Sequence, residues 1–251
     1  MTIFVCEDSF EGVLTGVYDA WASHIHRKQL RIEVGPIGQR EFFAEYVPVS
    51  ANSEKTEKVM RSIHRKISYY AYRQCMYCAL SAHKDRGDAI YRFLLLGFTY
   101  GAQVTKYLQE PSVMKVFEYS RAYGNEAHYY REFVRFSSWN QVYISHISPK
   151  GDVLSFVGDH FADRMPSEHF IIVDDVRKKA IIHPKNEECF LRFLTEEEFQ
   201  SILSYEKKKD NYTDLWQTFF ETIAIKERYN PTCQRNHLPL HFRKHMVEFT
   251  S

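Results

Sequence analysis

The residues of this chain that are best suited to chemistry are histidines and arginines that follow a glutamate. Glu126 and His128 stand shortly before Arg135, and His160 and Arg164 come further along the chain. A histidine side chain exchanges protons near neutral pH, and an arginine side chain binds phosphate or stabilises developing negative charge. These five residues therefore predict a site at which a histidine acts as general acid or base on an anionic substrate.

A structural role is the alternative for the same residues. A pair between Glu126 and Arg135 can simply orient the junction between two elements. Asp174 and Asp175, with Arg177, form a similar polar group in apolar surroundings. Together these groups suggest one shared polar site, but the sequence leaves open whether they meet in space.

Two basic stretches suggest contact with phosphates. Lys58, Arg61 and Arg65 recur at spacings of three and four residues, so they share one face of a predicted helix. Such a stripe suits the backbone of a nucleic acid, although a solvated helix face has the same pattern and Glu54 can pair with Lys58. The predicted phosphate-contacting residues are Lys58, Arg61, Arg65, Arg228, Arg243 and Lys244.

The spacing of cysteine and histidine does not indicate a metal site. Cys75 and Cys78 form a lone C-x-x-C, and a second ligand pair at zinc-site spacing is missing. His241 and His245 have helical spacing but lack further ligands. The glycine-rich nucleotide loops, H-E-x-x-H, G-x-S-x-G and the three-cysteine cluster of radical-SAM enzymes are also absent. We predict neither a cofactor nor a metal.

The composition is that of a globular protein. Of the 251 residues, 44% are hydrophobic and 26% charged, which argues against disorder. The net charge of +1 provides no global attraction to nucleic acid, so a polyanion site must be a local patch. The first residues lack the pattern of a signal peptide, and the most apolar segment, 93–99, is too short to span a bilayer. We expect a cytoplasmic protein without membrane contact.

Hydrophobic periodicity predicts strands and helices in separate regions. Ser9 is expected to cap a first helix after a strand at residues 1–7, and residues 42–49 are expected to be extended, with Pro48 at an edge. Further helices are predicted at 53–66, 68–83, 87–108, 111–128 and 158–164, and near 195–207, 211–224 and 239–249. A hairpin of 132–137 and 141–147 and strands at 153–157, 170–173 and 179–182 are also predicted.

This order of elements predicts an α+β fold rather than an alternating α/β fold. N-terminal strands and a helical bundle are followed by a small, mostly antiparallel sheet in the middle to C-terminal part and by C-terminal helices. We expect residues 1–251 to form a single α+β unit. The alternative is a division into 1–124, mainly helical, and 125–251, with a hairpin-rich sheet and the C-terminal helices.

Short motifs along nearly the whole chain resemble those of one bacterial family. The first are Phe10-Glu11-Gly12 and Val17-Tyr18-Asp19-Ala20-Trp21. Others are Glu126-x-His128, Phe133-Val134-Arg135-Phe136, His160-Phe161-x-x-Arg164 and Asp174-x-x-Arg177-x-x-Ala180. The last are Trp216-x-x-x-Phe220, Ile223-x-Ile225-x-x-Arg228-x-Asn230-Pro231, Gln234, Pro239 and Arg243-Lys244-x-Met246. The family is a domain of unknown function labelled "probable DNA metabolism protein" or "putative DNA repair protein".

The resemblance implies a DNA-repair context. Members of that family accompany a radical-SAM protein proposed to repair or modify DNA, and related domains are fused to uracil-DNA-glycosylase-like domains. The main hypothesis is an accessory DNA-binding protein that acts with such a partner, with Tyr129 or Trp139 stacking on an exposed base. The alternatives are an enzyme that acts on a damaged base or phosphodiester, and a non-catalytic protein–protein adaptor. The oligomeric state is left open.

Overall fold

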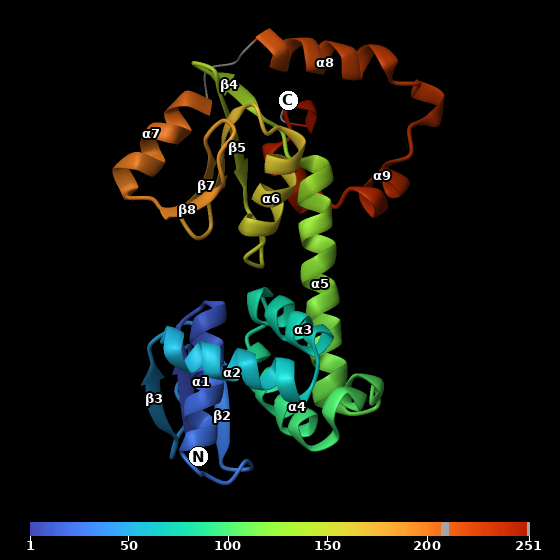
Figure 1. Cartoon of the computed structure of the whole chain (residues 1–251). Coiled ribbons are helices and arrows are strands. Elements are labelled where there is room, and N and C mark those ends of the chain that lie inside the picture. Colours follow the sequence, from blue (N-terminus) through green and yellow to red (C-terminus); the bar gives the residue numbers. More distant parts are fainter. Residues whose placement is uncertain (207–210, 250–251) are drawn as a thin grey trace. The chain divides into compact units, whose positions relative to one another are not determined.

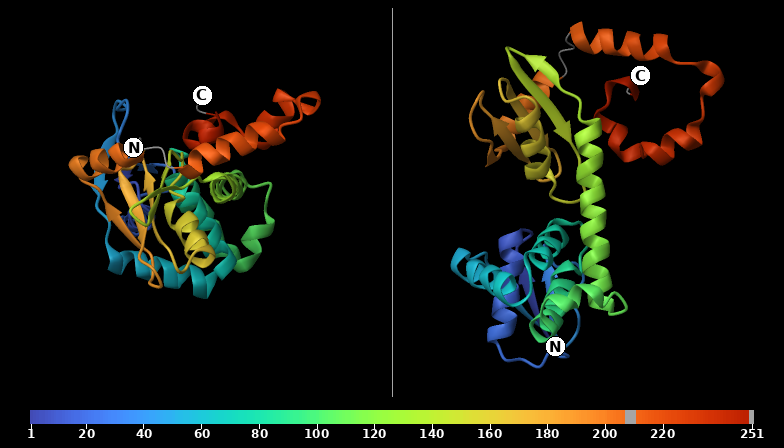
Figure 2. Two further views of the ribbon diagram at one scale, coloured as in Figure 1. Left: turned by 90° about the horizontal axis from the view of Figure 1, so that it is seen from above. Right: turned by 45° about the vertical axis from the view of Figure 1, so that its right-hand side comes forward.

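The computed structural model describes residues 1–206 and 211–249 of the chain (Figures 1 and 2). The chain separates into two compact units, Met1–Gly124 and Asn125–Ser251, which we call unit 1 and unit 2. Each unit contains a β-sheet together with helices, which confirms the predicted α+β class.

Unit 1 is built on a three-stranded parallel sheet in the order β2-β1-β3. Its strands are β1 (Thr2–Cys6), β2 (Leu30–Val34) and β3 (Glu45–Val49). Its helices are α1 (Phe10–Ala22), α2 (Ser53–Lys66), α3 (Tyr69–Leu80) and α4 (Arg86–Tyr100), followed by the 3₁₀ helix η1 (Gly101–Lys106). The boundary between the units falls within α5 (Pro111–Phe133).

Local sequence signals explain the start of unit 1. The Ser9 side chain accepts a hydrogen bond from the Gly12 N–H and begins α1 where the sequence predicted. Parallel strands need a crossover connection, and α1 supplies it between β1 and β2. Pro48 lies in β3, at the edge of the sheet as predicted, because proline cannot donate a hydrogen bond to a further strand.

Unit 2 contains a five-stranded sheet in the order β4-β5-β6-β7-β8. Only β5 and β6 run parallel, so the predicted mostly antiparallel sheet is confirmed. The strands are β4 (Ser137–Trp139), β5 (Val142–Ile147), β6 (His169–Asp174), β7 (Lys179–His183) and β8 (Phe190–Phe193). The helices are α6 (Leu154–Arg164), α7 (Glu196–Glu206), α8 (Asn211–Ile223) and α9 (Pro231–His237), with 3₁₀ helices η2 (Lys226–Arg228), η3 (Leu240–His245) and η4 (Val247–Phe249).

Helices α6 and α7 cover opposite faces of this sheet (Figure 1). Gly158 of α6 lies so close to Ile181 of β7 that a β-carbon there would meet its side chain. Phe199 of α7 instead packs with Val173 and Ala180, which face the other way. Neighbouring residues of a strand point to opposite faces of the sheet. The same strands therefore carry one set of apolar side chains that packs against α6 and another that packs against α7.

Two predicted strands of unit 2 differ from the structure. The predicted hairpin forms between β4 and β5, but Phe133 is still helical and Arg135 lies in the link between α5 and β4, so its first arm is Ser137–Trp139 rather than 132–137. The predicted strand at 153–157 is the start of α6. Its buried residues Leu154, Val157 and Phe161 recur at spacings of three and four, which is the period of a helix rather than of a strand.

Other differences arise at helix ends. The predicted helix at 87–108 ends as α4 at Tyr100, because Gly101 adopts a positive φ of 60°, and the chain continues as η1. The predicted helix at 239–249 consists only of the short 3₁₀ helices η3 and η4. Strands β2 and β8 and helix α9 were not predicted. Residue 207, the end of the predicted helix at 195–207, lies outside the described residues.

Within residues 1–206 and 211–249, no helix combines the length and apolar character needed to cross a membrane.

The tight start of α1 gives a first prediction. A β-carbon on Gly12 would lie 2.5 Å from the carbonyl oxygen of Glu7, so the backbone must shift. We expect Gly12→Ala to lower the free energy of unfolding by about 1–2 kcal/mol, despite the better helix propensity of alanine. Gly124→Ala is the matched control, because Gly124 is also helical but has no atom within 4 Å of its β-carbon position. It should raise stability by about 0.5–1 kcal/mol. Equal urea midpoints for the two variants would contradict this explanation.

Candidate functional site

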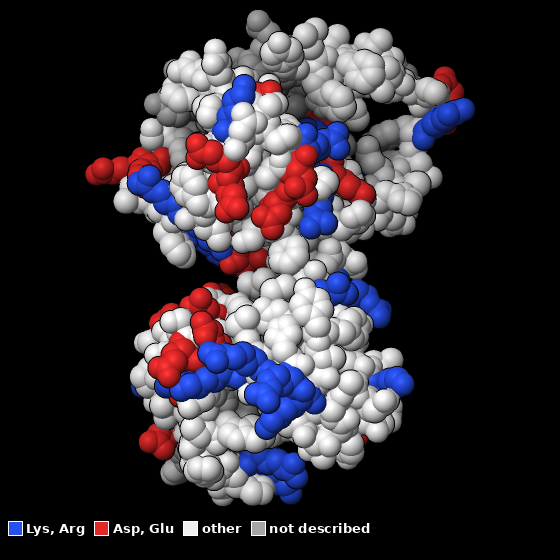
Figure 3. Space-filling view, in the orientation of Figure 1, with Lys and Arg blue, Asp and Glu red and all other residues white. Residues whose placement is uncertain are grey.

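The basic face of α2 follows from the amphipathic pattern of this helix. Thr56, Val59 and Ile63 are buried at spacings of three and four residues, which fixes the inward side. Lys58 and Arg61 therefore lie on the exposed side together with Arg65. Lysine and arginine side chains gather over α2 in the space-filling view (Figure 3). The sequence-predicted basic stripe is thus an exposed face of unit 1.

The cations of this face have only exposed partners. Lys58 Nζ lies 2.6 Å from Glu54 Oε1, and an Arg61 nitrogen lies 2.7 Å from Glu57 Oε2. Such pairs on a helix surface contribute little free energy and are screened by salt. Arg65 has no hydrogen bond or ion pair within the described part of the chain. A phosphate can therefore compete for all three cations.

A groove of about 590 Å³ lies beside this face. It is lined by the aromatic side chains of Tyr18, Trp21 and Phe98, by the cations Arg27, Lys58 and Lys66, and by smaller residues of α1, α2 and α4. Trp21 is 50% exposed and packs edge-on against Phe98, with ring centroids 5.3 Å apart. Lys66 Nζ lies 5.8 Å from the centre of the Phe98 ring. No described lining residue is acidic.

This groove, which we call the aromatic–basic groove, was not predicted from the sequence. Tyr18 and Trp21 are three residues apart on α1, and this spacing does not separate a core role from an exposed one. The signal that could have indicated the groove is the presence of these aromatic residues together with the basic helix α2. Aromatic rings with surrounding cations can stack on a base and hold its phosphate.

A second cavity, of about 580 Å³, lies in unit 2. It is lined by His128, Arg131, Glu132, Val134, Arg135, His160, Phe161 and Arg164. We call it the His–Arg cavity. His128, Arg131 and Arg135 follow one another at spacings of three and four residues along and just beyond α5, and His160 and Arg164 lie one turn apart on α6. The structure therefore brings together four of the five residues predicted for catalysis.

The cations of the His–Arg cavity differ in their partners. His128 Nε2 lies 3.0 Å from Glu132 Oε1. Arg135 donates to Glu248 at 2.8 Å, and this glutamate side chain is only 2% exposed. Arg164 is exposed and forms no hydrogen bond or ion pair within the described residues. Arg164 is therefore the cation most available to a ligand.

The electrostatics of the cavity favour a neutral histidine. Burial, with help from Arg131 and Arg164, lowers the pKa of His160 below its ordinary value of 6.5, and Asp163 only partly opposes this shift. Near neutral pH the imidazole is therefore uncharged, with one nitrogen that donates and one that accepts. Such a group can exchange a proton with a bound ligand.

Glu126 does not line this cavity. It lies two residues before His128, roughly 200° around the helix, so the two side chains leave α5 on different sides. The Glu126 carboxylate instead accepts hydrogen bonds from the N–H groups of Lys150 at 2.7 Å and Gly151 at 2.9 Å. This fastens the loop between β5 and α6, so Glu126 has a structural role. The expected pair of Glu126 with Arg135 is not formed, because Arg135 pairs with Glu248 instead.

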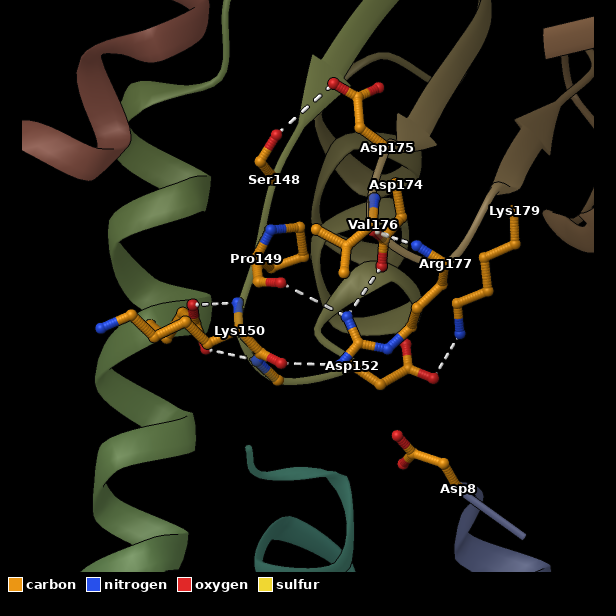
Figure 4. Close-up of polar contacts among 12 residues, drawn as sticks. Asp8, Ser148, Pro149, Lys150, Asp152, Asp174, Asp175, Val176, Arg177 and Lys179 are labelled. Carbon is orange, nitrogen blue, oxygen red and sulfur yellow. Dashed lines mark hydrogen bonds and ion pairs between the residues drawn. The ribbon is translucent and has the colours of Figure 1, made fainter. Parts of the chain in front are cut away.

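The same loop is held from its other side by Arg177. Its guanidinium donates to the carbonyl oxygens of Pro149 at 3.4 Å and Lys150 at 2.7 Å, and to Asp174 Oδ2 at 3.2 Å (Figure 4). Asp174 is fully buried and also accepts the N–H groups of Val176 and Arg177. We call Glu126, Asp174 and Arg177 the loop clamp. The polar groups of the sequence thus form two sites rather than one.

The C-terminal cations lie in different settings. Arg243 donates to the carbonyl oxygen of Leu238 and stacks over Phe249, so its guanidinium has a structural role. Lys244 is 60% exposed and donates to the hydroxyl of Ser148 at 2.9 Å. Arg228 is exposed in η2. They are less suited to phosphate contact than the α2 face.

The two residues expected to stack on a base, Tyr129 and Trp139, are only partly exposed. Tyr129 packs against Phe133 and Phe242, with ring centroids 6.1 and 4.9 Å away. Trp139 is half-buried in β4. In unit 1, Trp21 presents a larger open ring surface.

Among the residues that the structure describes, no group of three or more His, Cys, Asp or Glu side chains is arranged to hold an ion. Cys75 and Cys78 are buried in the core of unit 1, and burial raises the pKa of both thiols. They therefore stay protonated, as apolar packing residues do.

Fold and sites together define an α+β protein with an aromatic–basic groove and a separate His–Arg cavity. Residues 84–248 match the family model described as a domain of unknown function, DUF4130. Because this match covers more than half of the 251 residues, the chain belongs to that family. The His–Arg cavity lies wholly within the matched range, whereas α1 and α2 precede it. Comparison with curated proteins gives no match.

The loop clamp leads to a prediction about stability. Glu126→Gln removes the charge that strengthens two hydrogen bonds and leaves only one oxygen acceptor. We expect the free energy of unfolding to fall by about 1–2 kcal/mol in chemical denaturation. Glu132→Gln on the same helix is the control, because its pair with His128 is exposed and should change stability by less than about 0.5 kcal/mol. An equal loss in both variants would refute the clamp.

Proposed function

We propose that the protein binds nucleic acid through the aromatic–basic groove of unit 1 and serves as an accessory protein in DNA repair. The observation that carries the binding proposal is the exposed Trp21 ring in a groove whose charged lining residues, among those described, are all cations. Stacking on aromatic rings stabilises bound bases by about 1–3 kcal/mol each, and nearby cations attract the phosphates.

Single-stranded DNA is the form that fits this groove best. In a duplex the bases stack on one another, so Trp21 and Tyr18 can reach only an unpaired base. A volume of about 590 Å³ is in the range of small-ligand sites and accommodates a nucleotide unit rather than a helix. Lys58 and Lys66, two turns apart on α2, can then contact successive phosphates.

The DNA-repair context and the radical-SAM partner rest on the resemblance of the sequence motifs. A protein that lacks the three-cysteine cluster of that enzyme class would need such a partner to supply its chemistry. Contact with a protein is also supported by α8, on which Leu215, Phe219 and Ile223 are exposed at spacings of four residues. An apolar stripe of this kind is typical of surfaces that bind a protein.

Binding to DNA should depend steeply on salt. Fluorescence anisotropy with a labelled single-stranded oligonucleotide should show a linear fall of log affinity with log salt, and Lys66→Gln should reduce this slope by about 0.7–1. Trp21→Ala should weaken binding at least about fivefold at every salt concentration, because stacking is not ionic. Lys106→Gln is the control, because this exposed lysine of unit 1 does not line the groove.

Affinity that is indifferent to salt, or a stronger preference for duplex than for single strands, would contradict the proposed interface. A stable complex with the radical-SAM protein that forms without DNA, together with no DNA binding at low salt, would favour the adaptor function instead.

An enzyme is the second candidate, favoured by the meeting of His128, His160 and Arg164 in one cavity. In this function a histidine is general acid or base, and the arginines stabilise negative charge on a damaged base or phosphodiester. Arg135, already paired with Glu248, would contribute less than Arg164.

The enzyme candidate predicts a defined pH profile. With bis(p-nitrophenyl) phosphate as a test phosphodiester, a reaction that uses His160 as base should lose rate only below pH 6.5, because the pKa of His160 is lowered from that value. His160→Ala should reduce turnover by about 10²–10⁴-fold. His128→Ala tests the other histidine. Turnover that survives both substitutions would exclude these roles.

A further inference from the structure

Cations from two helical regions surround the His–Arg cavity. Arg131 and Arg135 come from the end of α5 and the residues just after it, and Arg164 comes from the last turn of α6. Glu248 compensates the charge of Arg135, whereas Arg131 and Arg164 form no ion pair within the described residues and repel each other unless an anion lies between them. Among the described lining residues, Glu132 alone carries a carboxylate, and it lies beside His128.

Two of these guanidinium groups retain unused donors. Arg164 has no hydrogen bond or ion pair within the described residues. Arg131 donates to the carbonyl oxygen of Phe156 at 3.3 Å, but its Nε is shielded from water and has no acceptor within the described part of the chain. Because this Nε is closed to water, a ligand in the cavity contacts the exposed part of the half-buried Arg131 side chain. Planar guanidinium groups match the oxygens of phosphate.

Nearby carboxylates weaken the attraction of the His–Arg cavity for small anions in general. Asp163 acts on His160, and Asp159 lies within electrostatic reach of Arg131. These carboxylates of α6 do not line the cavity but weaken its positive field. Binding must then depend on directed hydrogen bonds to a doubly charged group, which favours phosphate over chloride.

The size and the wall of the cavity indicate what is attached to the phosphate. A volume of about 580 Å³ greatly exceeds that of a phosphate ion and lies in the range of sites for small organic ligands. Phe161 and Val134 add an apolar surface. Nucleotides combine a phosphate with a flat group that packs against such a surface.

We infer that the His–Arg cavity of unit 2 binds the phosphate monoester of a nucleotide. Arg164 and Arg131 hold the phosphate oxygens, and Phe161 contacts the base or sugar. The ligand is either a free nucleoside monophosphate or the terminal phosphate of a DNA strand, which share this chemistry. The inference requires no catalysis and does not rest on the aromatic–basic groove of unit 1.

The experiment is an NMR titration of the full chain with deoxyadenosine monophosphate, followed through the histidine ring signals. The signal of His160 should shift and its pKa should rise on binding, because a dianion stabilises the imidazolium. Arg164→Gln and Arg131→Gln should each weaken binding about tenfold or more. Arg164 is exposed, so its variant should fold normally even if Arg131→Gln does not. Arg192→Gln is the control, because Arg192 of β8 forms an exposed pair with Glu198.

Comparison of ligands identifies the source of the phosphate. Oligonucleotides with and without a 5′-phosphate are titrated into the Trp21→Ala variant, which suppresses binding at the groove of unit 1. Tight binding only of the phosphorylated strand assigns the cavity to DNA ends, and tight binding only of the monophosphate assigns it to free nucleotides. Equal binding of deoxyadenosine and its monophosphate, no shift of the His160 signal, or an equal loss in the Arg192→Gln control would overturn the inference.

Discussion

The buried carboxylate of Asp174 is the constraint on which the geometry of unit 2 depends. Burial raises the pKa of this carboxyl group, and Arg177 with two backbone N–H groups compensates the charge. Because Arg177 also holds the carbonyl groups of the loop before α6, pairing one buried charge fixes where α6 begins. Glu126 connects the same loop to α5. The two helices that line the His–Arg cavity are therefore positioned by polar groups outside it.

Helix α5 contributes both to the loop clamp and to the His–Arg cavity, because its different sides carry different residues. Glu126 faces the loop clamp, whereas His128, Arg131 and Glu132 follow the helical repeat along the side that borders the cavity. This division requires the helix to continue to Phe133. If the chain became extended at residue 132, as the alternation around Arg135 indicated, Glu132 and Arg135 would no longer follow the helical repeat of His128 and Arg131, and no cavity of this composition would form.

The sequence predicted what depends on local pattern. The α+β class, the cap at Ser9 and the mostly antiparallel sheet are determined by turn residues, capping groups and periodicity within a few positions. Such patterns cannot predict contacts between residues that are distant in sequence. The Trp21–Phe98 contact and the Arg135–Glu248 pair join residues separated by dozens of positions. Short apolar runs were ambiguous as well, and the residues after Val153 proved helical.

The near-neutral charge of the chain is compatible with nucleic-acid binding because of how α2 pairs its own residues. Glu54 and Glu57 neutralise Lys58 and Arg61 in the free protein, so an approaching phosphate must displace a carboxylate. This competition lowers affinity for any polyanion that offers charge alone. Lys66 has no carboxylate partner within the described residues and lies against Phe98 at the groove. A ligand that stacks in the groove as well as contacting phosphates gains free energy that a merely charged surface does not, so the proposed interface would favour unpaired bases over charge density.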